Sequence, residues 1–152
     1  MKKLSLVLAA TVVCAPLWMS SAQAQFAKPE DAIKYRQSAF SMLSTHMSRL
    51  QPVLKGQVAF DAAAVKANVA VIQTLSTLPW SAFGAGTQGT SSAKPEIWSD
   101  AAGFKAAQQK FQASVVQLSA AADSGDLSKL RSAAGDVGAS CKACHDSYRA
   151  KK

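Results

Sequence analysis

Acidic residues, histidine and cysteine are scarce in this chain of 152 residues, which contains 9 Asp and Glu, 2 His and 3 Cys. Three cysteines are too few for a disulfide-stapled scaffold. Aromatic residues make up only 7%, and no stretch alternates apolar and polar residues over the length of a strand, so a β-sandwich is disfavoured. Charged residues account for 17% and hydrophobic residues for 49%, which excludes intrinsic disorder. Alanine is abundant instead, and it favours helices.

Negative charge is outweighed by 17 Lys and Arg, which give a formal net charge of +8. A basic exported protein can meet nucleic acid, anionic lipid or an acidic protein. Because the basic residues are dispersed, without an arginine-rich run or interleaved aromatic residues, we do not expect nucleic acid as a partner. The basic tail at residues 149–152 is interpreted as a solvated chain end, with a docking patch for an acidic partner as the alternative.

The start of the chain has the features of a Sec-type signal peptide. A positive pair of lysines is followed by an uncharged apolar stretch and by an A-x-A cleavage signal at residues 22–24. The apolar stretch over residues 4–19 has 16 residues, fewer than the roughly 20 that cross a bilayer, so no membrane anchor is expected. Cys14 lacks the small preceding residue of a lipidation site. We therefore predict that residues 1–24 are a cleaved leader.

Residues 25–152 form the predicted periplasmic domain, and their apolar residues recur at the three- and four-residue spacing of helices. Capping and breaking residues divide this domain into four helices. The first begins at Pro29 and kinks or ends at Pro52, the second follows Asp61 and stops before Pro79, the third runs from about Ser99 to Gly125, and the fourth follows Asp126. We therefore predict an all-α fold, an antiparallel four-helix bundle.

The fourth predicted helix carries Cys141-Lys142-Ala143-Cys144-His145, the C-x-x-C-H pattern of c-type haem attachment. Cysteines three residues apart lie on one helix face, where each can form a thioether to the same porphyrin, and His145 then offers an imidazole to the iron. Both cysteines continue the apolar stripe of their helix, so they point into the bundle. The pattern predicts one covalent haem c per chain, with His145 as an iron ligand.

Three other interpretations of these cysteines are weaker. A redox-active pair normally sits at a helix start, where the dipole lowers the thiol pKa, whereas this pair is near a helix end. A disulfide between positions three apart fits regular helix geometry poorly. A zinc site would need a fourth ligand beyond Cys141, Cys144 and His145, and His46 is the other histidine of the chain.

Two side chains on the first predicted helix acquire a role if haem lies in the bundle. Arg36 falls on the inward stripe, where a buried guanidinium needs an anion and no acid shares the stripe, so a haem propionate is its predicted partner. The alternative is an arginine that snorkels to the end of the bundle. Phe40, one turn further along, is either core packing or the roof over the open side of the iron.

The first helix offers no convincing second iron ligand. Met42 and His46 lie off the stripe, and Met47 lies two turns beyond Phe40, about 10 Å along the axis. No methionine follows His145 in the chain. We therefore predict five-coordinate iron with an apolar distal side, and a sixth ligand, if present, would be Met47.

Several segments occur here in a combination that is more specific than the C-x-x-C-H motif. They are Lys28-Pro29-Glu30-Asp31-Ala32, Tyr35-Arg36-Gln37, Leu78-Pro79-Trp80, Phe83-Gly84, Pro95-Glu96-Ile97-Trp98 and Gly135-Asp136-Val137-Gly138. With them the mature chain resembles a cytochrome c′ of denitrifying proteobacteria. The resemblance implies that Cys141 and Cys144 anchor the haem and that His145 is the sole axial ligand. It also implies that Arg36 contacts a propionate and that Arg149 lies beside the proximal face.

The resemblance departs from the family pattern at the distal position. Close relatives often carry leucine there and low-spin members of the bundle family carry a methionine ligand, whereas this chain has Phe40. The resemblance implies a homodimeric periplasmic protein that binds NO and CO and takes part in electron transfer. The alternative is a plain six-coordinate electron carrier for a respiratory oxidoreductase. No enzyme such as a peroxidase is expected, because the sequence offers no distal His–Arg pair and His46 is interpreted as a solvated surface residue.

Overall fold

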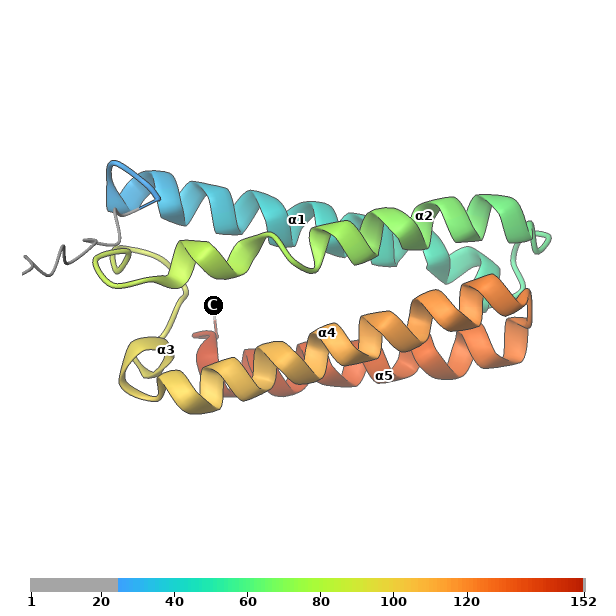
Figure 1. The fold of residues 1–152 in the computed structure, drawn as a ribbon. Helices are drawn as coiled ribbons and strands as arrows, with labels where there is room; N and C mark the ends of the chain where they lie inside the picture. The colour runs from blue at the N-terminus through green and yellow to red at the C-terminus, as the bar shows by residue number, and fades with distance from the viewer. Residues whose placement is uncertain (1–24, 152) are drawn as a thin grey trace, which may run out of the picture.

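The computed structural model describes residues 25–151, so the predicted signal peptide lies outside the described residues. Each of the four long helices runs antiparallel to the one before it (Figure 1). They are α1 (Pro29–Leu54), α2 (Ala62–Leu75), α4 (Ala101–Ser124) and α5 (Leu127–Tyr148). A 3₁₀ helix, η1 (Pro79–Phe83), and a one-turn helix, α3 (Glu96–Ser99), lie in the connection between α2 and α4. The predicted all-α four-helix bundle is confirmed.

Short-range signals in the sequence set most helix boundaries. Asp61 caps α2 by accepting the N–H of Ala64 at 3.0 Å, and Asp126 caps α5 by accepting the N–H of Ser128 at 2.8 Å. Gly125 ends α4 in the left-handed region, with φ of +67°, where a side chain would be strained. These boundaries are the predicted ones.

Two boundaries differ from the prediction. Pro52 does not end α1, which continues to Leu54; only the missing N–H of one residue is lost from the helical hydrogen bonds, and two more residues complete the last turn. The third long helix does not begin at Ser99, which instead ends α3. Asp100 breaks the chain with φ −115° and ψ 56°, and its carboxylate then caps α4 by accepting the N–H of Gly103 at 3.0 Å.

The core is built from the apolar stripes of the four long helices. Its main buried members are Leu43, Leu50, Val65, Val69, Ile72, Leu75, Phe111, Val115, Leu118, Leu130 and Val137. Burial of one such side chain contributes about 1.5–3 kcal/mol to folding. This core is aliphatic apart from Phe111 and is called the aliphatic core below; it occupies the middle of the bundle and the end where α1 turns into α2 and α4 into α5.

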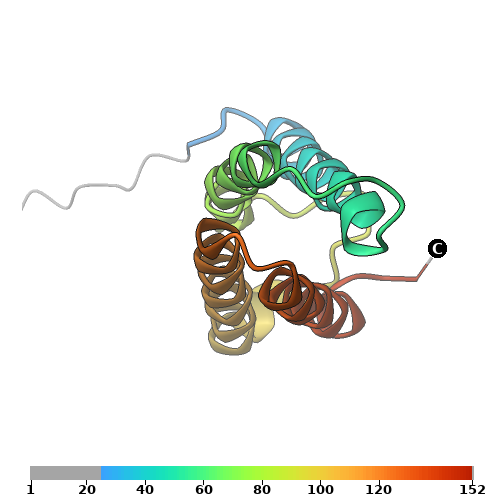
Figure 2. The same ribbon diagram turned by 90° about the vertical axis from the view of Figure 1, so that its right-hand side faces the viewer.

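The opposite end of the bundle is more open. Figure 1 shows the α1–α2 pair and the α4–α5 pair diverging toward the end that carries α3 and the C-terminus. Viewed along the axis, the helices follow one another around the bundle in the order α1, α2, α4 and α5 (Figure 2). α1 packs mainly on α2 and η1 and touches α5 only sparsely. Within residues 25–151, no helix combines the length and apolar character needed to cross a bilayer.

Candidate haem site

The two cysteines of the C-x-x-C-H motif lie on the inner side of α5, near its C-terminal end. Both are half-buried free thiols, and Cys141 packs against the aliphatic core. Burial raises the pKa of both thiols, and the charge of Cys141 adds to the effect at Cys144. A redox-active pair requires a lowered thiol pKa, so the structure does not support that interpretation.

The imidazole of His145 is in the last turn of α5 and is exposed. Partial burial lowers the pKa of His145, as does the positive charge of Arg149, while Asp146 opposes them. Both effects favour the neutral imidazole, the form that binds a metal. In the part of the chain that the structure describes, no three His, Cys, Asp or Glu residues come together as a metal site, so zinc is not supported.

Five rings fill the divergent end of the bundle and form what we call the aromatic cluster: Phe40, Trp80, Phe83, Phe104 and Tyr148. Phe40, from α1, meets the Trp80 ring edge-on at 5.7 Å between centroids and lies 6.3 Å from that of Phe83. Phe104, from α4, lies 5.0 Å from Phe83 and 5.3 Å from Tyr148. The cluster thus connects α1, η1 and α4 to α5, the helix that carries the two cysteines. The prediction that Phe40 faces inward is confirmed.

Arg36 is buried, with 2% of its surface exposed, so the alternative of a snorkelling arginine is wrong. Its Nη1 donates to the carbonyl oxygens of Ala82 at 2.8 Å and Thr87 at 2.9 Å, and its Nη2 donates to Ser91 Oγ at 3.3 Å. The guanidinium carbon lies 4.7 Å from the centre of the Phe83 ring. Burial lowers the pKa of Arg36 from its usual value.

These contacts correct one premise of the sequence argument. Neutral carbonyl oxygens satisfy much of the guanidinium of Arg36, so its burial does not by itself require an anion. Of the five N–H donors of an arginine, two remain, one on Nε and one on Nη2. A propionate partner for these donors is compatible with the structure and stays a prediction.

Arg149 does not continue the helix that carries His145. α5 ends at Tyr148, and Arg149 has extended backbone angles, φ −123° and ψ 127°. Its N–H still donates to the carbonyl of His145 at 3.0 Å. The helical spacing used to place its side chain beside the proximal face therefore does not apply, although its charge does act on His145.

The chain around Arg149 pairs with the connection that precedes α3. Ala93 and Arg149 form an isolated antiparallel bridge. The ammonium of Lys94 donates to the carbonyls of Asp146 at 2.9 Å and Ser147 at 3.2 Å. Sequence reasoning missed Lys94, because the residues it joins are more than fifty positions apart and no periodic pattern connects them.

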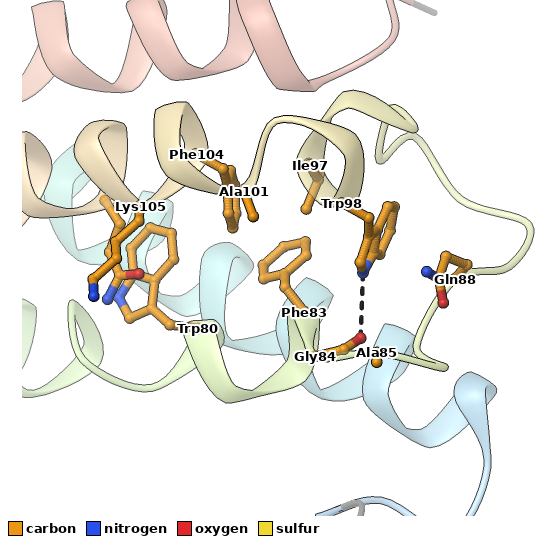
Figure 3. Close-up of a pocket in the computed structure, with 11 residues that line it drawn as sticks. Trp80, Phe83, Gly84, Ala85, Gln88, Ile97, Trp98, Ala101, Phe104 and Lys105 are labelled. Atoms are coloured by element: carbon orange, nitrogen blue, oxygen red, sulfur yellow. Dashed lines mark hydrogen bonds between the residues drawn. The ribbon is translucent and has the colours of Figure 1, made fainter.

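A pocket of about 560 Å³ opens on the η1 side of the aromatic cluster (Figure 3). Trp80, Phe83 and Phe104 of the cluster form part of its wall. On its outer side, Trp98 Nε1 donates to the carbonyl of Gly84 at 3.2 Å. The pocket shows that one flank of the cluster is reachable from the surface.

His46 is not the solvated surface residue that we expected. It is half-buried, its Nδ1 lies 2.7 Å from Asn68 Oδ1, and its carbonyl accepts from Asn68 Nδ2 at 2.9 Å. The pair joins α1 to α2. His46 is thereby occupied away from the aromatic cluster.

Comparison with known proteins agrees with this geometry. The model of the cytochrome c′ family matches residues 31–149. The chain belongs to the cytochrome c′ family. It is 67% identical over 128 residues to cytochrome c′ of Alcaligenes xylosoxydans xylosoxydans, covering 84% of this chain and 100% of that protein. It is 49% identical over 130 residues to cytochrome c′ of Rubrivivax gelatinosus, again covering 84% of this chain and 100% of that protein.

Solved structures of the same family match the fold. One is the nitric oxide complex of a leucine-to-alanine mutant of cytochrome c prime from Alcaligenes xylosoxidans, with a TM-score of 0.82 and 66% identity. Another is a ferrous arginine-to-lysine variant of that protein with bound NO, also with a TM-score of 0.82 and 66% identity. Each match covers 84% of this chain and 100% of the solved one.

Cytochromes c′ bind covalently attached haem c, which is therefore the cofactor of this chain. The described residues fit it. Cys141 and Cys144 stand three positions apart on one face of α5 and are half-buried rather than solvated. His145 follows directly, and the aromatic cluster supplies apolar surroundings at the end where the helix pairs diverge.

Proposed function

We propose that this protein is a periplasmic cytochrome c′ with five-coordinate, high-spin iron that binds NO and CO and takes part in electron transfer. Cys141 and Cys144 hold the haem through thioethers, and His145 is the sole axial ligand. When bound, the haem supplies an iron that takes up diatomic gases and exchanges electrons. Signal-like residues 1–24 support export, and no helix within residues 25–151 is long and apolar enough to cross a bilayer.

The main support for this proposal is that the polar atoms of the aromatic cluster already form hydrogen bonds to other residues of the protein. The indole N–H of Trp80 donates to the carbonyl of Ser76 at 2.6 Å, and the hydroxyl of Tyr148 donates to Asp100 at 2.9 Å. Phe40 has no polar atom to offer. The cluster therefore offers an apolar surface and gives no hydrogen bond to bound O₂, which favours neutral ligands such as NO and CO.

The two arginines have distinct proposed roles. Arg36 uses its two remaining donors to hold a haem propionate, while its other three hold η1, through Ala82, and the connection after it, through Thr87 and Ser91. Arg149 places positive charge near His145, which adds to the effect of burial in lowering the pKa of the imidazole and so favours its neutral, metal-binding form. Neither residue bonds to a reacting gas, so both act by positioning and electrostatics.

The competing function is a six-coordinate electron carrier for a respiratory oxidoreductase. Of the candidate sixth ligands, Met42 is 48% exposed and His46 is held by Asn68. Met47 packs against the aliphatic core, two turns from Phe40. Ligation by Met47 would require it to leave that core, so the five-coordinate state is favoured. A peroxidase-like enzyme is also disfavoured, because His46, which would have to act as the distal acid–base residue, is bonded to Asn68 away from the cluster.

A homodimer is the proposed oligomeric state. Tyr35 and Met42 are exposed at 37% and 48% and, being seven residues apart, lie on one face of α1. Val71 of the neighbouring α2 is 39% exposed. Large apolar side chains on adjacent exposed helices support burial against a second copy.

The first test is the visible spectrum of holoprotein exported from a host with haem-attachment machinery. In the reduced protein we expect a broad high-spin spectrum that sharpens when CO or NO is added. Sharp, split visible bands before any gas is added would reveal a sixth ligand and support the electron-carrier function instead. A Met47→Leu variant with unchanged bands would then exclude Met47 as that ligand.

A further inference from the structure

The segment that follows His145 is tied to a short stretch far away in the sequence, which we call the brace, residues 91–94. The N–H of Lys94 donates to the carbonyl of Tyr148 at 3.0 Å, and the N–H of Ala150 donates to the carbonyl of Ser92 at 2.8 Å. Figure 1 shows the chain end turning from α5 toward the yellow connection that carries the brace. The end of α5 is therefore fixed by more than its own helical bonds.

The side chain of Lys94 adds a second layer of contact. Its ammonium donates to the carbonyls of Asp146 at 2.9 Å and Ser147 at 3.2 Å. These carbonyls belong to the final turn, where a helix has no intrahelical donors left for them. A cation at this position also complements the negative end of the helix dipole. α5 has no basic residue besides His145 in its own last turn, so the brace supplies that charge.

The other end of the brace is anchored on α1. Ser91 Oγ accepts from Arg36 Nη2 at 3.3 Å and from the N–H of Ala93 at 3.3 Å. Arg36 is itself immobilised by burial and by its bonds to the carbonyls of Ala82 and Thr87. A continuous chain of hydrogen bonds thus runs from the interior of α1 through the brace to the turn that holds His145.

We propose that the brace positions the axial ligand: Lys94, backed by Ser91 and Arg36, holds the last turn of α5 in place and so sets the geometry of the bond between His145 and the iron. Helix ends fray readily, and local opening of this turn would tilt or withdraw the imidazole. Lys94 is a positioning residue in this account and touches neither the iron nor the gas. The inference rests on the proposed function in one respect, the assignment of His145 as axial ligand.

The test compares three holoprotein variants with the unaltered protein. Lys94→Met removes the ammonium but keeps the length of the side chain, Lys94→Arg keeps the charge and the donors, and Lys105→Met removes an exposed lysine of α4 at the same end. Hydrogen–deuterium exchange of the C-terminal peptide, residues 145–152, reports on fraying. The iron–histidine stretching band of the reduced protein, seen by resonance Raman spectroscopy, reports on ligand geometry.

We expect Lys94→Met, which removes both exposed hydrogen bonds of the ammonium, to speed exchange of this peptide by about three- to tenfold, the range for a typical net hydrogen-bond contribution, and to shift or broaden the stretching band. Lys94→Arg and Lys105→Met should stay within about twofold of the unaltered protein and leave the band in place. Ser91→Ala, which cuts the connection to Arg36, should speed exchange of the same peptide by about two- to threefold.

Unchanged exchange in Lys94→Met would overturn the brace. Faster exchange with an unmoved band would overturn its role in positioning His145. If Lys105→Met shifted the band equally, the shift would result from the loss of one positive charge, and the role of Lys94 in positioning His145 would be overturned as well. If the unaltered protein lacks an iron–histidine band, the assignment of His145 fails, while the exchange data still decide whether the brace exists.

Discussion

Replacing Arg36 with methionine would show how strongly one buried guanidinium holds the connection after η1. The substitution removes three hydrogen bonds, two of them to carbonyls of residues that are themselves buried, Ala82 at 0% and Thr87 at 7% exposure. A buried carbonyl left without a donor costs about 1–3 kcal/mol. Methionine keeps part of the packing on Phe83, so we expect the free energy of unfolding to fall by about 2–4 kcal/mol.

Chemical unfolding of the holoprotein, followed by far-UV circular dichroism, measures this loss, and the midpoint of thermal unfolding should drop by about 4 °C for each kcal/mol. Arg49→Met is the matched control, because Arg49 is an exposed arginine on the same helix. Arg36→Lys should fall between the two, since a lysine keeps the charge but not the forked donors. A loss below about 1 kcal/mol, or one equal to that of Arg49→Met, would refute the account of Arg36 as an anchor.

Three further predictions concern gas access, assembly and pH. Phe40→Leu should bind CO and NO about fivefold faster, because moving the phenyl ring aside breaks an edge contact with Trp80 worth about 1 kcal/mol; equal association rates in stopped-flow experiments would contradict this. Met42→Asp should convert the dimer to monomer in light-scattering measurements, whereas a monomeric unaltered protein would remove the basis of the dimer proposal. Hydrogen bonds from the N–H groups of Lys129 and Ser128 lower the pKa of Asp126, so its contribution to stability is complete above the unfolded pKa near 4 and is lost as pH falls through the lower folded value. Asp126→Ala should accordingly lower the melting temperature at pH 7, and the difference should shrink below about pH 4; a difference independent of pH would contradict the capping role.

Features governed by neighbouring residues could be predicted from the sequence. Asp61 and Asp126 cap their helices as expected, since a cap depends on contacts within about three positions. The C-x-x-C-H motif is likewise local, so its place on the inner face of α5 followed from helical spacing. The family assignment, based on segments spread over the chain, is confirmed.

Features that depend on distant contacts could not be predicted. The acceptors of Arg36 lie 46 to 55 positions away, and no pattern in the sequence pairs a stripe arginine with loop carbonyls. The same holds for Lys94, whose partners follow it by 52 and 53 positions. His46 was misjudged because its neighbour Asn68 belongs to another helix, 22 positions away. Backbone acceptors are invisible to side-chain patterning, which explains why an anion was expected beside Arg36.

The order in which the helices touch has a consequence for how the polypeptide folds. α2 packs on α1, α4 on α2 and α5 on α4, while the first and last helices touch sparsely. Such sequential contacts have low contact order, which is associated with folding in microseconds to milliseconds. Each helix can therefore pack on the one before it, and the bundle does not need an early contact between α1 and α5, whose loop-closure entropy would be large.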